Sequence, residues 1–229
     1  MRFADRSPRN HPVVRRLDLG LVHLPDWHPR YAESTAQIFA YLIEHPDGFV
    51  LFDCGCGADD EIINKLYRPK ITPLQAALNN CGLSIDCISA VVVSHLHFDH
   101  CGQLPSLAGR PIFVQKAELE VARSPGYTAA KWAEIDSTDC RTLDGDEWLA
   151  PGLQIIRTPG HTPGHQSLVV TGGGETTIIG GQCCYRHAGL EPESFEFDNL
   201  HDQNSEQAAR DSLARLRSLN AERLFLAHE

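Results

Sequence analysis

The chain has 229 residues and a mass of 25.3 kDa, which is long enough for one domain to bury a full-sized core. Its hydrophobic content of 42% and charged content of 22% are ordinary for a soluble globular protein. The formal net charge of -10 argues against nucleic acid and anionic membrane surfaces as partners, because like charges repel.

The first expected element is a β-hairpin. Apolar runs at residues 38–43 and 49–52 flank the sequence His-Pro-Asp-Gly at 45–48, whose proline, aspartate and glycine favour a tight turn. An amphipathic pattern that starts after a proline and ends at a glycine predicts a helix over 73–83. The continuous apolar run that leads into the histidines at 90–95 is typical of a strand covered on both faces.

The second half of the chain contains runs of expected strands that are interrupted by helices. Residues 124–150 are rich in turn formers and acids, and we expect an irregular surface insertion there, near the functional site. Strands in runs, interrupted by helices, predict two sheets with helices outside, a four-layer αββα sandwich of the α/β class. The remaining expected elements are strands at 110–115, 153–160, 167–171, 176–179 and 223–229, and helices at 116–123 and 205–219, the last with Ser205 as N-cap.

Eight cysteines are spread along the chain without the spacing of a disulfide framework or a C-x-x-C zinc motif. We expect most of them to be small buried apolar residues.

Histidines and an aspartate follow the strand predicted at 90–95. They are His95, His97, Asp99 and His100, within the sequence Ser-His-Leu-His-Phe-Asp-His. In an extended segment residues i and i+2 point the same way, so His95 and His97 can hold one ion, while the following loop turns Asp99 and His100 toward a second position. Imidazole nitrogens and carboxylate oxygens are the ligands that suit zinc.

The sequence Thr-Pro-Gly-His repeats at 158–165 and contributes His161 and His165. Its prolines and glycines impose a rigid path, which is suited to fixing a ligand. We expect His161 to complete a cup of three histidines and His165 to have a supporting role. His228 lies at the end of the last strand, where a site built from loops would lie.

These motifs together resemble the metallo-β-lactamase superfamily and, within it, the quorum-quenching N-acyl-homoserine lactonases. The resemblance implies an αββα sandwich with a metal pair between the edges of the two sheets. Carried over motif by motif, it implies that Asp53 supports a ligand histidine. The first metal would be held by His95, His97 and His161, and the second by Asp99, His100 and His228.

Gln182 departs from this resemblance, because lactonase-like members have there an aspartate that bridges both metals. An amide offers a neutral carbonyl oxygen and no negative charge. Three interpretations stay open: two metals are still bound, one metal is bound tightly and the second weakly, or catalysis is lost and the fold serves for binding. Cys183, the next residue, points to the other face of a strand and is not expected to be a ligand.

The resemblance also implies a catalytic role for Tyr185, whose hydroxyl would steady the substrate oxyanion, although packing is the alternative. Asp99 would orient the nucleophile and pass its proton to the leaving group. The predicted activity is zinc-dependent hydrolysis by a metal-bound hydroxide of an ester-like carbonyl, most simply a lactone. Alternatives are a thioesterase of glyoxalase type, a β-lactamase or a non-catalytic binding protein. Iron, cobalt or manganese can take the place of zinc.

The expected partner is a small molecule with an ester, lactone or thioester carbonyl. The N-terminal arm, residues 24–35 and the 124–150 segment would set specificity. Trp27 and Tyr31 are candidate pocket walls, with surface or core packing as the favoured alternative. No apolar run reaches the roughly 18 residues of a membrane span, and the N-terminus lacks the apolar core of a signal peptide. We therefore expect a cytoplasmic single domain over residues 1–229, with a loose arm at 1–12, as a monomer or homodimer.

Overall fold

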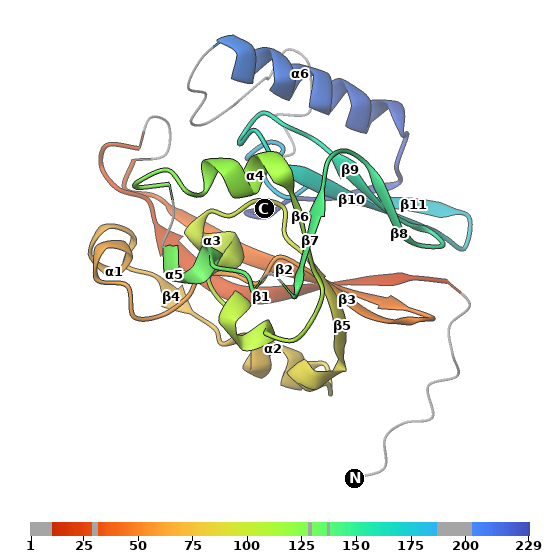
Figure 1. Ribbon diagram of the computed structural model, residues 1–229, viewed down its shortest axis with the longest axis horizontal. Coiled ribbons are helices and arrows are strands. Elements are labelled where there is room, and N and C mark those ends of the chain that lie inside the picture. The colour runs from red at the N-terminus through yellow and green to blue at the C-terminus, as the bar shows by residue number, and fades with distance from the viewer. Residues whose placement is uncertain (1–10, 29–31, 128–129, 137, 187–202) are drawn as a thin grey trace.

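Two β-sheets packed face to face form the centre of the molecule (Figure 1). The computed structural model describes residues 11–28, 32–127, 130–136, 138–186 and 203–229. Within these residues the strands form a seven-stranded sheet, in the order β4-β1-β2-β3-β5-β6-β7, and a five-stranded sheet, in the order β12-β11-β10-β9-β8.

The first sheet is mixed. Strands β1, β2 and β3 are antiparallel neighbours, and β3, β5, β6 and β7 run parallel. Its strands are β1 Val13–His23, β2 Thr35–His45, β3 Gly48–Phe52, β4 Lys70–Ile71, β5 Ile88–Val92, β6 Ile112–Gln115 and β7 Cys140–Leu143.

The second sheet is antiparallel except where β12 runs parallel to β11. Its strands are β8 Glu147–Ala150, β9 Leu153–Arg157, β10 Gln166–Gly172, β11 Glu175–Ile179 and β12 Arg223–Phe225. The helices are α1 Glu61–Tyr67, α2 Leu74–Asn80, α3 Phe98–Cys101, α4 Lys116–Val121, α5 Ala130–Ala133 and α6 Gln203–Ser218, with short 3-10 turns at Ile85–Cys87 and Leu104–Leu107.

Alternation along the strands produces three apolar layers. On β2 the side chains of Phe39, Tyr41 and Ile43 enter the layer between the two sheets, whereas Ala40 and Leu42 enter the layer beneath α1 and α2. The third layer lies between the five-stranded sheet and α6, which covers that sheet in Figure 1. Three apolar layers between four layers of secondary structure confirm the predicted αββα sandwich.

Several local predictions were wrong. The 124–150 segment is not an irregular insertion, because β7 and β8 within it add an edge strand to each sheet. Ser205 is not an N-cap, since α6 already begins at Gln203. Strand β1 was not predicted, because two arginines and a bulge between Asp18 and Leu21 break its alternation.

Two predictions concern residues outside the described ranges, and the prediction for the cysteines is confirmed. Residues 1–10 of the expected N-terminal arm, and Tyr31, lie outside the described residues. Five of the eight cysteines, all of which lie in the described ranges, are buried, and all eight are free.

Leu226 and Ala227 are bonded to β2 and to the turn after β11. The backbone N–H of Phe39 donates to the carbonyl of Ala227, and the N–H of Ala227 donates to the carbonyl of Gly181. The hydroxyl of Tyr41, which is 1% exposed, donates to the carbonyl of Leu226. His228 is therefore held in a fixed place although it is next to the end of the chain.

Replacing Tyr41 with phenylalanine tests this attachment. Tyr41→Phe keeps the ring in the core and removes the bond to the Leu226 carbonyl, so the free energy of unfolding should fall by about 1 kcal/mol. Urea denaturation measures the change. Tyr67→Phe is a matched control, because within the described residues the Tyr67 hydroxyl makes no hydrogen bond. Equal stabilities of the two variants would contradict the expectation.

Candidate metal centre

Three histidine nitrogens converge where the two sheets meet. Nε2 of His95 lies 2.9 Å from Nδ1 of His97, which lies 3.0 Å from Nε2 of His161. Four-coordinate zinc with nitrogens about 2.0–2.1 Å away keeps its ligands roughly 3.3 Å apart, so this spacing suits one ion. Burial and the neighbouring imidazoles hold the pKa of both His95 and His161 well below the usual range, which keeps their lone pairs free.

A second group lies beside the first. It consists of Asp99, His100 and His228, whose ligand atoms lie within 4.8 Å of one another. Oδ2 of Asp99 is 3.8 Å from Nε2 of His100 and 3.6 Å from Nε2 of His228. The rings of His95 and His100 are 4.0 Å apart between centroids, so the two groups are neighbours.

The carboxylate of Asp53 fixes the outer side of both groups. Its Oδ2 accepts from Nδ1 of His100 at 2.8 Å and from the hydroxyl of Ser94 at 2.8 Å. The Ser94 oxygen in turn lies 3.0 Å from Nδ1 of His95. His228 is oriented separately, because its Nδ1 donates to the carbonyl of Gln37 at 2.7 Å.

These outer bonds leave acceptors on the inside of the second group. Because Nδ1 of His100 and of His228 carry the donated protons, their Nε2 atoms present lone pairs. A carboxylate and an amide oxygen face them, so the buried cluster contains acceptors and lacks a donor. Burial lowers the pKa of His100, but Asp99 and Asp53 outweigh it and raise that pKa to about 9, so without a bound cation a proton on Nε2 takes the position that a metal would occupy. The donor set of both groups therefore fits metal cations.

Gln182 belongs to the second group by position. Its side-chain oxygen is 3.3 Å from Nε2 of His100 and 3.3 Å from Nε2 of His228. The turn that precedes it requires glycine: Gly181 has φ +60°, and a Cβ there would lie 2.9 Å from Nε2 of His165. The side-chain oxygen of Gln182 thus lies against both histidines of the second group.

His165 is committed to hydrogen bonds on both sides. Its Nδ1 donates to the carbonyl of Thr158 at 2.9 Å, and its Nε2 accepts from the backbone N–H of Gln182 at 3.0 Å. Burial lowers its pKa to about 3, so the ring is neutral. The structure therefore brings His161, and not His165, into the group of three.

Tyr185 lies at the rim of the second group. It is half-buried, and its ring stacks on His228 with centroids 5.3 Å apart and planes at 27°. Cys183 and Cys184 both pack in the apolar layer beneath α6. The strand alternation expected for Cys183 does not apply, because β11 ends at Ile179 and both cysteines lie in the turn that follows.

Comparison with known proteins explains this arrangement. Residues 35–228, most of the chain, match the metallo-beta-lactamase superfamily. The chain belongs to that superfamily. An N-acyl homoserine lactonase from a Bacillus species is 30% identical over 195 residues, which cover 80% of this chain and 76% of the relative. AttM, an N-acyl homoserine lactonase of Rhizobium radiobacter, is 30% identical over 165 residues and 61% of both chains.

Solved structures share the metallo-beta-lactamase fold of this chain. A variant of AiiA from Bacillus thuringiensis with N-decanoyl-L-homoserine at its active site superposes with a TM-score of 0.79, covering 94% of this chain and 92% of that one at 23% identity. An N-acyl homoserine lactone lactonase described as quorum-quenching superposes with a TM-score of 0.77 at 25% identity, covering 94% and 91%.

The sequence did not predict that one acid, Glu118, is buried next to the group of three histidines. Glu118 lies in α4, is 0% exposed and accepts from the backbone N–H of Leu96, between His95 and His97. Nothing in the sequence separates it from the exposed Glu120 on the same helix. Only the folded chain shows which of the two acids faces inward.

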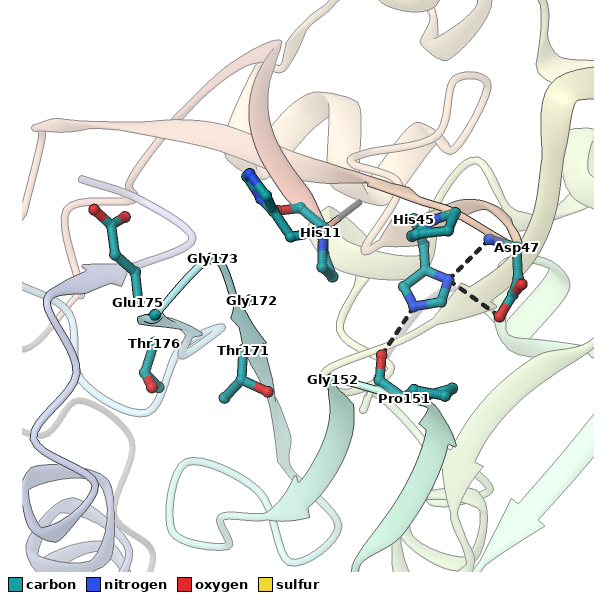
Figure 2. Close-up of a pocket in the computed structure, with 13 residues that line it drawn as sticks. His11, His45, Asp47, Pro151, Gly152, Thr171, Gly172, Gly173, Glu175 and Thr176 are labelled. Atoms are coloured by element: carbon teal, nitrogen blue, oxygen red, sulfur yellow. Dashed lines mark hydrogen bonds and ion pairs between the residues drawn. The ribbon is translucent and has the colours of Figure 1, made fainter. Parts of the chain in front are cut away.

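A hollow at the other end of the sandwich has a structural explanation (Figure 2). The turn between β2 and β3 borders it, at the opposite end of the sheet from the two candidate ligand groups. His45 uses both ring nitrogens there: Nδ1 accepts from the N–H of Asp47 at 3.1 Å, and Nε2 donates to the carbonyl of Pro151 at 2.9 Å. His45 thus joins the two sheets at this end.

Among the described residues, no helix is long and apolar enough to cross a bilayer.

Proposed function

We propose that this superfamily member is a zinc-dependent hydrolase that opens a lactone, as its N-acyl homoserine lactonase relatives are named for doing. The observation that carries the proposal is the pair of adjacent ligand groups, three histidines in one and Asp99, His100 and His228 in the other. His95, His161 and His100 are buried, and hydrogen bonds from outside orient His100 and His228, as is usual for metal ligands.

The chain's own residues can bind and orient the substrate and move a proton. Bound zinc supplies Lewis acidity and lowers the pKa of water toward about 7. Asp99 lies 12% exposed between His100 and His228, so its carboxylate can accept a proton from an attacking water and return it to the leaving oxygen. Neighbouring His100 and His228 outweigh burial and hold the pKa of Asp99 below its usual range, which keeps it ionised for this task.

Aromatic rings lead from the candidate centre to the surface and support a substrate with an apolar part. Phe98, which directly precedes Asp99, packs on Tyr67 with ring centroids 4.5 Å apart. Tyr67 contacts Trp27 edge to face at 6.4 Å, and Trp27 is 59% exposed. An acyl chain attached to a lactone is the kind of group that these rings can cover.

A panel of substrates tests the proposal. The zinc-loaded protein should hydrolyse N-acyl homoserine lactones faster than simple thioesters or a chromogenic β-lactam. His97→Ala should show no turnover, because it removes a nitrogen from the group of three. Faster turnover of thioester or β-lactam would favour the glyoxalase-type or β-lactamase alternative. Turnover of none of them by the metal-loaded protein would favour a binding protein.

Tyr185 is proposed to donate a hydrogen bond to the carbonyl oxygen of the substrate, since its ring lies on His228. Tyr185→Phe keeps that ring and removes the donor, so kcat should fall by about 100-fold while metal content stays the same. Steady-state kinetics and a metal count on the same sample measure both. An unchanged kcat would leave Tyr185 with a packing role only.

We propose that Gln182 weakens the binding of the second zinc without preventing it, because a neutral oxygen, and not a carboxylate, faces His100 and His228. Protein in excess zinc should hold two equivalents and lose one on dialysis. Gln182→Asp should raise the affinity for this second equivalent more than about tenfold, since it adds a negative charge.

Gln182→Asn is the matched control for that change, because it has the shape of aspartate without its charge. Metal content after dialysis, measured by elemental analysis, distinguishes the variants. One equivalent per chain in excess zinc would overturn the two-metal interpretation, and equal affinities of the Asp and Asn variants would remove the role of charge.

The cytoplasmic location, the single domain and the choice between monomer and homodimer stay predictions from the sequence. Iron, cobalt or manganese in place of zinc is an outcome that the same elemental analysis detects.

A further inference from the structure

Glu118 is a buried carboxylate outside the two ligand groups. It is 0% exposed, and within the described residues no ion pair involves it. Burial raises its pKa, whereas the hydrogen bonds that it accepts act in the opposite direction. An acid with no opposite charge in the interior is costly unless donors surround it, so its partners explain its presence.

The partners of Glu118 lie on the segments that carry the group of three histidines. Oε1 accepts from the backbone N–H of Leu96 at 2.8 Å, between His95 and His97. Oε2 accepts from the hydroxyl of Thr162 at 2.6 Å, directly after His161. One carboxylate therefore joins the two segments that must meet for the three nitrogens to converge.

Tyr127 brings a third segment to the same carboxylate. Its hydroxyl donates to Oε1 of Glu118, and its ring packs on His97 with centroids 4.7 Å apart and planes at 40°. The bond to Glu118 thus also holds the aromatic surface on which His97 rests.

The backbone of the 158–165 loop packs so closely on α4 that position 164 has no room for a Cβ. A Cβ at Gly164 would lie 2.2 Å from the backbone nitrogen and 2.4 Å from Cβ of Glu118. On the other side of the loop, a Cβ at Gly160 would lie 2.5 Å from Cβ of Ala209 in α6. The loop that carries His161 is therefore packed between two helices.

We propose that Glu118 is a positioning residue for the three-histidine group, and that its carboxylate sets the distances between His95, His97 and His161. This inference rests on the proposed metal-binding function. It assigns to Glu118 no contact with metal or substrate. Asp53 orients His100 and, through Ser94, the outer nitrogen of His95, whereas Glu118 fixes the loops themselves.

Zinc affinity, measured by chelator competition, tests the assignment without reference to activity. Glu118→Gln keeps the size of the side chain but replaces one of its two acceptor oxygens by a donor. The affinity for the tighter zinc should fall about 10- to 100-fold, the range for losing a group that orients a metal ligand. Glu120→Gln, on the exposed side of α4, is the matched control and should bind zinc as the unaltered protein does.

A second pair of variants separates the hydrogen bond from folding. Thr162→Val removes the hydroxyl that donates to Glu118, and Thr162→Ser retains it. The valine variant should lose zinc affinity in the same direction, and the serine variant should recover most of it. Urea denaturation of the metal-free proteins verifies that the variants compared are folded.

The outcomes distinguish this inference from the proposed function. Equal zinc affinities of Glu118→Gln and Glu120→Gln, or of Thr162→Val and Thr162→Ser, would overturn the positioning role while leaving the hydrolase proposal intact. Loss of affinity in the predicted variants supports the role even if the unaltered, zinc-loaded protein hydrolyses no lactone. Failure of the unaltered protein to bind zinc would overturn both.

Discussion

The hydrogen bonds of Asp53 are the interaction on which the rest of the candidate centre depends. Its Oδ1 accepts from the backbone N–H of Ser94 at 2.7 Å, which ties the end of β3 to the end of β5. Its Oδ2 reaches His100 directly and His95 through the Ser94 hydroxyl. Asp53 itself has φ +61°, a conformation that aspartate tolerates better than most residues. One buried carboxylate thus links the sheet to a histidine of each group.

The sandwich makes such a centre possible because it brings distant strand ends to one edge. His95 follows β5, His161 lies between β9 and β10, and Gln182 follows β11. His228 follows β12, which runs parallel to β11, so both strands deliver their next residues to the same place. The polar cluster lies where the apolar layers end, and Asp53 and the Gln37 carbonyl orient its acceptors from the outside.

The sequence predicted the elements whose signal is local. The strand before the histidines and the helix after Pro73 have uninterrupted patterns, and the four-layer fold follows from their order. The ligand candidates were found because histidine and aspartate are rare in such density, and the structure brings the six of them into two groups. Their roles as ligands stay predictions.

What the sequence did not predict depends on contacts between distant segments. Strand β1 has charged residues and a bulge that hide its alternation, and β7 and β8 are short edge strands that form only against an existing sheet. Glu118 and Glu120 look alike in sequence, and only the loop packed on α4 distinguishes them. The structure groups His161, and not His165, with His95 and His97, and the two hydrogen bonds that hold His165 apart are visible only in the fold.

The close contact between Gly160 and Ala209 has a consequence for attempts to evolve the protein in the laboratory. Ala209 is 1% exposed on α6, at the far side of the loop from the histidines. Any larger side chain there has to push against the 158–165 backbone, since the alanine Cβ already fills the space that a glycine leaves. Random libraries should therefore enrich small residues at position 209. A larger residue that is tolerated there would shift the backbone of the 158–165 loop, and with it His161, from the side of α6.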